Sequence, residues 1–237
     1  MPSPIVQTLR ARIGSASSPP AAVLPFGLDP IDRHLPGGGL AAAALHDIAA
    51  ATPDPADEAS ATIFLAAILA RLSGPVLWCR TRADLFAPAL HLAGLHADRV
   101  VHVLAADDVQ VLAAMEECLR HAGPVAVVGE VGSCPTTASK RLQLAAGKGG
   151  AMAFLLRRGE GGQHGGTAAV TRWRIGARPG ADPGFPGVGR PRWHVALERV
   201  RGGEPRAWMV EGADAEGRLA LPALLADRPA APEGLAA

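Results

Sequence analysis

The chain has 237 residues, with 23 lysines and arginines, 22 aspartates and glutamates and a formal net charge of +1. This length predicts one domain, or one domain with short arms. A hydrophobic content of 49% excludes a disordered chain, and three scattered cysteines exclude a disulfide scaffold or a zinc site. No apolar run reaches the roughly 20 residues that cross a bilayer. Because no charged and apolar leader follows Met1, we expect a cytoplasmic protein that does not bind membranes.

The first 20 residues predict a short amphipathic helix followed by a linker. Ile5, Leu9 and Ile13 recur at helical spacing, and serine and proline are frequent in residues 15–20. This helix is a candidate assembly segment. It could dock on another copy of the chain, on a partner protein, or on its own core.

From residue 21 onward, strand-like and helix-like segments alternate. Short continuous apolar strands separated by helices indicate a parallel sheet that is covered on both faces. After Gly159 the pattern changes to strands in which apolar and polar residues alternate, as in a half-covered antiparallel sheet. We therefore expect an α/β core domain over 21–212 and a partly disordered tail over 213–237. Strands are expected at 45–48, 75–79, 100–104, 124–128, 151–156, 170–175, 192–200 and 206–211, and helices at 55–72, 84–94, 108–121 and about 136–146.

The most informative segment is FGLDPIDRHLPGGGLAAAALHDI at residues 26–48. Its glycines Gly37, Gly38 and Gly39 permit a tight turn with positive φ that directs the chain into the next strand. The segment resembles the one that precedes the first core strand of RecA/RadA recombinases. The resemblance implies a RecA-like core with a mostly parallel sheet flanked by helices and antiparallel C-terminal strands. The matching residues are Gly27, Asp32, Leu35, Gly38, Gly39 and Leu40.

A recombinase would next carry a G-x-x-x-x-G-K-[ST] loop, whose amides, lysine and hydroxyl hold phosphate and magnesium. Residues 49–60 read AAATPDPADEAS instead, with no glycine and no lysine. Prolines remove amide donors, and carboxylates repel phosphate. The loop therefore reads as a lost nucleotide site. The degenerate phosphate-loop region consists of Pro53, Asp54, Pro55, Asp57 and Glu58.

The acidic residue that supports magnesium in the family should end the strand at 125–128. Gly129 stands in that place, and Glu130 follows one residue later, where strand alternation would turn it to the opposite face. We therefore expect Glu130 to point away from the nucleotide site.

Arginines stand at two further positions of the family's nucleotide site. Arg80 and Arg82 follow the strand that should lead to a catalytic glutamate, and Arg157 and Arg158 follow the strand that should deliver a polar amide. The four losses predict a RecA-like fold without ATP hydrolysis. We expect no catalytic residue, no cofactor and no bound metal.

A degenerate branch of this superfamily matches more closely. Over roughly residues 24–211, the chain resembles the ImuA family of the inducible mutagenesis cassette. The resemblance is carried by five segments, which are given at the end of this paragraph. The resemblance implies an accessory protein of damage-inducible (SOS) translesion synthesis. Its partners would be an ImuB-type protein, which is a catalytically inactive Y-family polymerase relative, and an error-prone C-family DNA polymerase. The segments are PFGLDPIDRHLPGGGLAAAALHDI, the degenerate loop, AVVGEV at 126–131, TRWRI at 171–175 and GRPRWHVALERVRGGEPRAWMVE at 189–211.

Charge is unevenly distributed along the chain. Residues 140–206 hold 13 basic and 4 acidic residues, a net charge of +9, so the remainder carries −8. A basic segment is typical of contact with a phosphate backbone, although a high-GC genome also favours arginine. Trp173 could stack on a base, but its alternation with Arg172 and Arg174 favours a core position. The candidate contacts for single-stranded DNA or an acidic partner are Arg157, Arg158, Arg172, Arg174, Arg190, Arg192 and Arg201.

Other functions remain open at this stage. A SulA-like inhibitor of cell division, which binds the tubulin-like division protein, is a related degenerate RecA-like fold. A modulator that binds RecA itself is compatible with the adaptor function. An unorthodox ATPase would need a lysine near phosphate, but Lys140 and Lys148 belong to the helix after the fourth strand.

Overall fold

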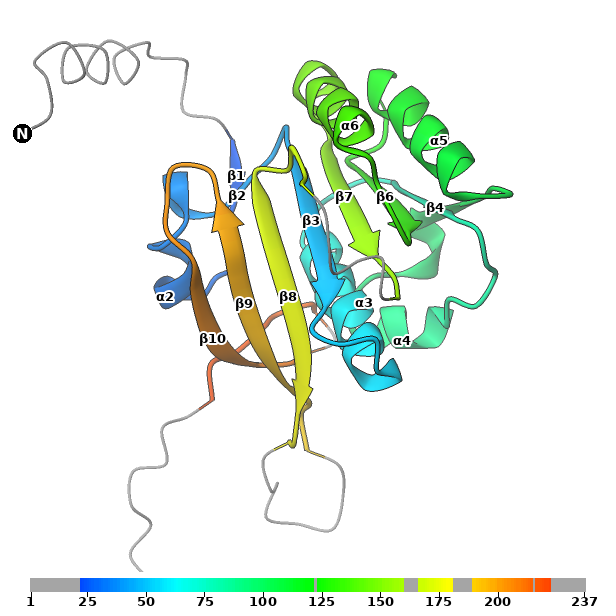
Figure 1. Ribbon diagram of the computed structural model, residues 1–237. Coiled ribbons are helices and arrows are strands. Elements are labelled where there is room, and N and C mark those ends of the chain that lie inside the picture. Colours follow the sequence, from blue (N-terminus) through cyan, green and yellow to red (C-terminus); the bar gives the residue numbers. More distant parts are fainter. Residues whose placement is uncertain (1–21, 122, 160–165, 181–188, 215, 223–237) are drawn as a thin grey trace, which may run out of the picture.

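The computed structural model describes residues 22–121, 123–159, 166–180, 189–214 and 216–222. Within these residues, one eight-stranded sheet has the order β10-β9-β8-β3-β7-β6-β4-β5 (Figure 1). Six neighbouring strands are parallel, and β9 and β10 extend the sheet in antiparallel fashion. The strands are β3 (Leu45–Ala50), β4 (Val76–Arg80), β5 (Val100–Leu104), β6 (Ala126–Val131), β7 (Met152–Arg157), β8 (Thr171–Arg178), β9 (Arg192–Val200) and β10 (Arg206–Glu211).

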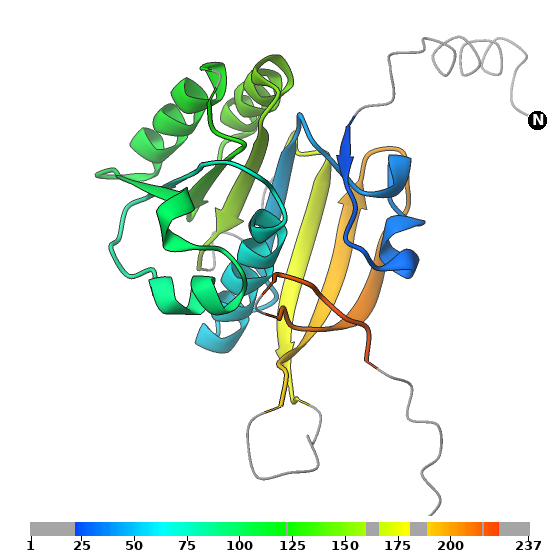
Figure 2. The same ribbon diagram turned by 180° about the vertical axis from the view of Figure 1, so that it is seen from behind.

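Helices cover both faces of the parallel part of the sheet. The helices α3 (Pro55–Ala70) and α4 (Ala87–Leu92) pack on one face, and α5 (Asp108–Arg120) and α6 (Thr136–Gly149) pack on the other (Figures 1 and 2). Helix α3 is apolar nearly all round and belongs to the larger of two buried clusters, which also contains the buried tryptophans. The sequence prediction of a RecA-like α/β core is confirmed by this arrangement.

The start of α3 follows from local chemistry that the sequence predicts. The carboxylate of Asp54 accepts a hydrogen bond from the backbone N–H of Ala56 at 2.8 Å, and Pro55 occupies the first turn. Proline is favourable there because the first turn leaves amide donors without intrahelical acceptors. The predicted helix at 55–72 is therefore confirmed, with its last residue at Ala70.

A compact turn precedes β3. The short strands β1 (Val23–Leu24) and β2 (Leu40–Ala41) pair, and the helix α2 (Asp29–Asp32) and the 3₁₀ turn η1 (Pro36–Gly38) lie between them. The carboxylate of Asp32 accepts hydrogen bonds from the backbone N–H groups of Phe26 (2.6 Å) and Leu28 (3.1 Å), so it caps the backbone of this turn. Gly37 and Gly38 have φ of 77° and 84°, as the glycine-rich turn predicts.

The antiparallel half of the sheet has one covered face and one open face. Trp193, Val195 and Leu197 point into the core, as their alternation predicts. Among the described residues, no helix covers the other face of β8, β9 and β10 (Figure 1). This open face carries the alternate residues of the three strands, including Arg174, His194 and Met209.

Several boundaries differ from the sequence-based ranges. Strand β6 continues to Val131 instead of ending at Val128, and α4 is shorter than the predicted 84–94, because the 3₁₀ turn η2 (Ala97–Arg99) follows it separately. In the tail, Leu219 is buried and Ala220 pairs with the backbone of Glu211, so residues 216–222 pack on the core. The helix with Ile5, Leu9 and Ile13 lies outside the described residues, as does 223–237. The domain boundaries at 20 and 212 stay predictions.

In the part of the chain that the structure describes, no helix combines the length and apolar character of a membrane span.

Candidate functional site

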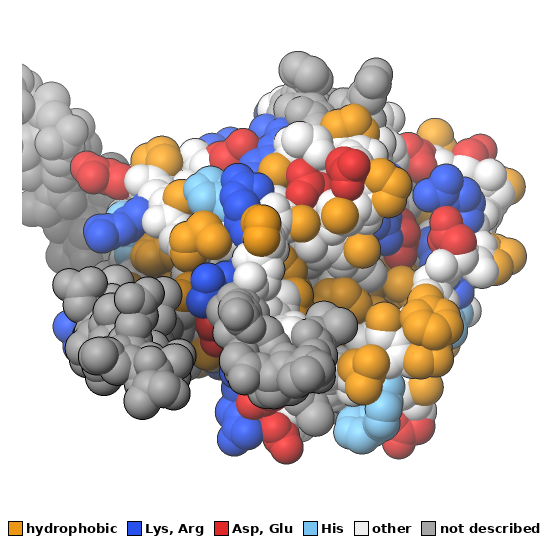
Figure 3. Space-filling view, turned by 90° about the horizontal axis from the view of Figure 1, so that it is seen from below, with side chains coloured by type: hydrophobic (Ala, Val, Ile, Leu, Met, Phe, Trp, Pro, Cys, Tyr) orange, Lys and Arg blue, Asp and Glu red, His pale blue; other side chains and the backbone are white. Residues whose placement is uncertain are grey.

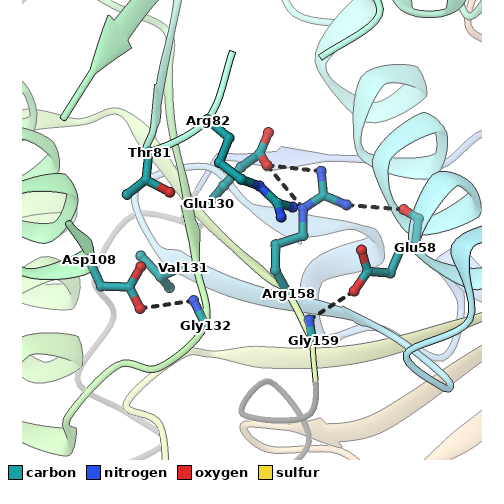
Figure 4. A pocket seen from close by; sticks show the side chains of 9 residues that line it. All are labelled: Glu58, Thr81, Arg82, Asp108, Glu130, Val131, Gly132, Arg158 and Gly159. Carbon is teal, nitrogen blue, oxygen red and sulfur yellow. Dashed lines mark hydrogen bonds and ion pairs between the residues drawn. The ribbon is translucent and has the colours of Figure 1, made fainter. Parts of the chain in front are cut away.

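A cavity of about 350 Å³ opens at the carboxyl edge of the parallel strands. Figure 3 views this edge from below, and Figure 4 shows the cavity from close by. In α/β sheets, this edge is where ligands commonly bind. The lining residues come from α3, from β6 and from the segments that follow β4, β6 and β7. They are Glu58, Thr81, Arg82, Asp108, Glu130, Val131, Gly132, Arg158 and Gly159.

Glu130 points into this cavity, so the prediction that it faces away was wrong. Val128, two residues earlier on the same side of β6, packs in the buried cluster that contains α3, so Glu130 faces α3, whereas Gly129 faces α5. A Cβ atom on Gly129 would lie 2.1 Å from the sulfur of Met115, which leaves room only for glycine. A carboxylate therefore stands at the end of β6 on the face toward α3, where it lines the cavity.

Arg158 neutralises Glu130. One carboxylate oxygen of Glu130 accepts a hydrogen bond from the Trp78 indole N–H at 2.6 Å, and the other lies 2.9 Å from the Arg158 guanidinium. Arg158 also donates to the backbone carbonyl of Glu58 at 3.3 Å. The guanidinium thus connects β6 and the end of β7 to the first turn of α3 (Figure 4).

The segment between β3 and α3, where the sequence predicts a degenerate phosphate loop, is closed by carboxylates of the protein itself. Only four residues, 51–54, separate β3 from α3. Asp57 accepts hydrogen bonds from the N–H of Thr52 (3.0 Å), from its hydroxyl (2.7 Å) and from the N–H of Ala177 (2.6 Å). Glu58 accepts one from the N–H of Gly159 at 2.8 Å. Pro53 and Pro55 contribute no amide donor.

The two arginines after β4 differ in their surroundings. Arg82 is exposed and forms an ion pair with Asp84 at 3.0 Å. Arg80 is only 8% exposed, and the structure gives its guanidinium no hydrogen bond or ion pair with any described residue. The pairing of Cys79 with Gly129 in the parallel register places Arg80 beside Glu130 on the face toward α3.

The structure separates the seven nominated arginines rather than gathering them into one basic face. Arg157 is buried against Asp47 at 3.3 Å, and Arg158 belongs to the cavity, so neither contributes to an exposed patch. On the open face, Arg172 pairs with Asp47 at 3.4 Å and Arg174 pairs with Glu198 at 3.0 Å.

Three of the nominated arginines lie farther from the cavity. Arg192 pairs with Glu211 at 3.4 Å, and Arg190 donates to the backbone carbonyl of Gly212 at 3.1 Å. Arg201 is exposed and lies 3.5 Å from the carbonyl oxygen of Ala168. Acidic partners therefore offset much of the basic charge that the sequence concentrates in this region.

Trp173 and Cys79 are both buried in the core, where they serve packing. Trp173 is fully buried and donates its indole N–H to the hydroxyl of Thr171 at 2.8 Å, so the core position is confirmed and base stacking is excluded. Burial raises the pKa of the Cys79 thiol to about 12, and a protonated thiol is a poor nucleophile. No local signal marks the face of Glu130, because Val128 and Val131, which lie on opposite sides of β6, are both buried.

The sheet order and the antiparallel extension define a RecA-like fold. The crystal structure of the RadB recombinase aligns with a TM-score of 0.59 at 14% identity, covering 84% of this chain and 99% of that one. No family model matches the sequence. Protein ImuA of Caulobacter vibrioides, from strains NA1000 / CB15N and CB 15, is 38% identical over 209 residues, covering 83% of this chain and 86% of the relative. The chain belongs to the ImuA family. Family and fold together support a RecA-like protein related to DNA damage.

Proposed function

We propose that the chain is a non-catalytic RecA-like adaptor in damage-inducible translesion synthesis. It would link an ImuB-type protein to an error-prone C-family DNA polymerase, directly or through the ImuB-type protein. The observation that carries the proposal is the Arg158–Glu130 ion pair, because it fills the site where a RecA-like ATPase would hold magnesium and phosphate. A fold that keeps its sheet but fills its nucleotide site is suited to binding rather than hydrolysis.

The physical argument against catalysis rests on the donors that phosphate needs. The amide and hydroxyl of Thr52 donate to Asp57, and the amide of Gly159 donates to Glu58, so these donors already have anionic acceptors. A nucleotide would have to displace two tethered carboxylates, without a lysine to compensate. This arrangement supports a protein that binds no nucleotide cofactor and is not an enzyme.

The charge pattern of the open sheet face favours a protein partner over bare nucleic acid. Arg174 pairs with Glu198, and Arg192 pairs with Glu211. Met209 lies on the same face, on the edge strand β10, and is 40% exposed. Mixed charges around exposed apolar side chains are typical of protein interfaces, whereas phosphate binding needs uncompensated basic groups. RecA is a further candidate partner for this face, and single-stranded DNA would have to use exposed arginines such as Arg201.

Two experiments test the proposal with the full-length protein. Isothermal titration with ATP and magnesium is expected to show no binding up to millimolar nucleotide, and micromolar affinity with turnover would overturn the non-catalytic assignment. Size-exclusion chromatography with the ImuB-type protein of the same cassette is expected to show a complex at micromolar concentrations. The absence of a complex at these concentrations would contradict the adaptor function.

A further inference from the structure

A groove runs between α5 and α6, which lie side by side on one face of the sheet (Figures 1 and 2). Two cavities, of about 200 Å³ and about 290 Å³, open along it and share Glu116 and Arg141, so together they form one continuous surface, which we call the α5–α6 groove. Each helix follows a strand of the parallel part of the sheet, so both helices start at the carboxyl edge. The groove therefore extends from the first turns of the two helices to their last turns.

The half of the groove near the helix starts is mainly apolar. Val109 from α5 and Ala138 from α6 line it, together with the buried Leu112 and Leu142. Val109 is 74% exposed, and Leu144, which lines the other half, is 65% exposed. Large apolar side chains that stay exposed beside a concave surface are typical of sites that bind another protein.

The half near the helix ends is basic. Arg120, Arg141 and Lys148 line it with a single carboxylate, that of Glu116, so three cationic groups face one anionic group and leave an excess of +2. The Glu116 side chain is only 10% exposed, and each of its two oxygens pairs with a different arginine. One carboxylate can neutralise only one of these two guanidiniums. Lys148 forms no ion pair with any residue that the structure describes.

The charged residues beside the groove leave this excess unchanged. Glu117 on α5 lies outside the lining and pairs with His121 at 2.9 Å and with Arg120 at 3.5 Å. The exposed Lys140 on α6 offsets its charge. Asp108 lies at the opposite, apolar end of the groove, where its carboxylate accepts the backbone N–H of Gly132 at 3.0 Å. The basic half is therefore complementary to an acidic ligand.

Close packing of the two helices fixes the position of the basic half. A Cβ atom on Gly149 would lie 1.9 Å from the carbonyl oxygen of Leu119, so only glycine permits this approach of α6 to α5. Lys148 precedes this glycine and Arg120 follows this leucine. The contact thus holds the two cationic residues on adjacent turns of neighbouring helices before any ligand binds.

We propose that the α5–α6 groove binds an amphipathic helix of a partner protein that is apolar at one end and acidic at the other. Its apolar side chains would pack against Val109 and Ala138, and its carboxylates would pair with Arg141 and Lys148. The 13 residues of α5 match a ligand helix of about 12 residues, at a rise of about 1.5 Å per residue. The inference rests on the proposed adaptor function only in taking the ligand to be a protein.

The charge of the groove argues against three other occupants. Residues 1–14 of the chain contain Arg10 and Arg12 and no acidic residue, so this segment does not complement a basic groove. The same groove of a second copy would oppose like charges. A nucleic acid would match the basic half but would leave the exposed Val109 and the apolar half without a partner.

The first test selects ligands with the full-length protein from a displayed library of helical peptides whose exposed face is randomised. Selected peptides are expected to gather Asp or Glu at one end and apolar residues at the other. Changing the acids to their amides should lower the affinity, measured by fluorescence anisotropy, at least tenfold, and added salt should weaken the binding of the acidic form. Selection of basic peptides, or of no shared pattern, overturns the proposal.

Matched pairs of variants locate the site. Lys148→Glu is expected to weaken binding of the selected peptides at least tenfold, whereas Lys140→Glu, on the same helix but outside the lining, should weaken it no more than twofold. Leu144→Ala should weaken binding at least fivefold, and Leu92→Ala on α4, at a side chain that is 71% exposed, should have no effect. All four side chains are exposed, and urea denaturation checks that each variant keeps its fold. Unchanged affinity in either groove variant, or an equal loss in its control, overturns the proposal.

Two competition experiments separate this inference from its alternatives. An excess of oligothymidylate should leave the bound peptide in place, and displacement would assign the basic half to nucleic acid and overturn the proposal. If the ImuB-type protein binds the chain while the library yields no acidic peptide, the groove inference is wrong and the adaptor function stands. If the selected acidic peptides require Lys148 but the ImuB-type protein forms no complex, the groove inference stands and the proposed partner is wrong.

Discussion

The guanidinium of Arg158 lies 2.9 Å from the carboxylate of Glu130, at the edge where β6 and β7 end side by side. The two side chains are 19% and 8% exposed, so water screens their interaction little. The pair therefore joins the ends of the two strands through a largely buried ionic contact.

Removing one partner of this pair should be far more damaging than removing both. We expect Arg158→Ala to lower the free energy of unfolding by about 3–5 kcal/mol, because the buried carboxylate of Glu130 loses the guanidinium that pairs with it. The double variant Arg158→Met with Glu130→Gln should lose much less, since neither member of the pair is left charged without its partner. Urea denaturation followed by circular dichroism measures both. Arg82→Ala, which breaks an exposed pair, is the control and should cost less than about 1 kcal/mol. Equal losses in the single and double buried variants would contradict this account.

Asp57 should matter more to stability than its neighbour Asp54. Asp57 accepts three hydrogen bonds from Thr52 and Ala177, so Asp57→Ala should cost about 2–3 kcal/mol. Asp54→Ala removes one exposed N-cap bond, and it should cost about 1 kcal/mol. We also expect Asp57→Asn to gain no affinity for ATP, because the loop still lacks a lysine. Thermal unfolding ranks the variants, and a larger loss in Asp54→Ala would refute the assigned roles.

The sheet could be predicted from the sequence because it depends on local patterns, and the degenerate phosphate loop, which stays a prediction, is inferred from patterns of the same kind. The apolar runs of β3, β5 and β7 and the prolines of 49–60 are visible residue by residue. The face of Glu130 could not be read in this way, because both sides of β6 are buried and only the packing shows which side meets α3: Val128 lies toward α3, whereas Val131 lies toward α5. Likewise, the basic count of 140–206 does not reveal that Asp47, far along the chain, pairs with Arg157 and Arg172.

Two adjacent glycines before β2 should respond differently to alanine. A Cβ on Gly39 would lie 2.5 Å from the carbonyl oxygen of Leu24, so Gly39→Ala must separate β1 from the turn. Gly38 has φ of 84° but open space around a Cβ, so Gly38→Ala should cost only the left-handed strain of about 1–2 kcal/mol. We expect the larger drop in the urea midpoint for Gly39→Ala. A larger drop for Gly38→Ala would mean that the close approach to Leu24 is not maintained in solution.

The stability of the fold should fall in mild acid because of His46. Burial lowers the pKa of this histidine from 6.5 to about 4, and its ring accepts from the hydroxyl of Thr171 while donating to the carbonyl of Ala41. Between pH 6.5 and 4 the unfolded chain therefore binds a proton that the folded protein does not bind. The free energy of unfolding should decrease by about 2 kcal/mol from pH 7 to pH 5 through this group. His46→Gln should be less stable at pH 7 and should lose this component of the pH dependence, measured by urea denaturation at several pH values. A pH dependence that is as steep in His46→Gln would show that another group causes it.

The arginines of β8 should contribute to stability rather than to binding of single-stranded DNA. Asp47 is buried and pairs with both Arg157 and Arg172, and Arg174 pairs with Glu198, so Arg172→Ala with Arg174→Ala should lower the free energy of unfolding. If the protein binds a labelled oligothymidylate, this double variant should keep the wild-type dependence of affinity on salt. Arg201→Ala, at an exposed position, should reduce the logarithmic salt slope by about 0.7 if it contacts one phosphate. Fluorescence anisotropy over a series of salt concentrations measures both slopes. A reduced slope in the double variant at unchanged stability would return the phosphate contact to β8, and the mixed-charge argument for a protein partner on the open face would then fail.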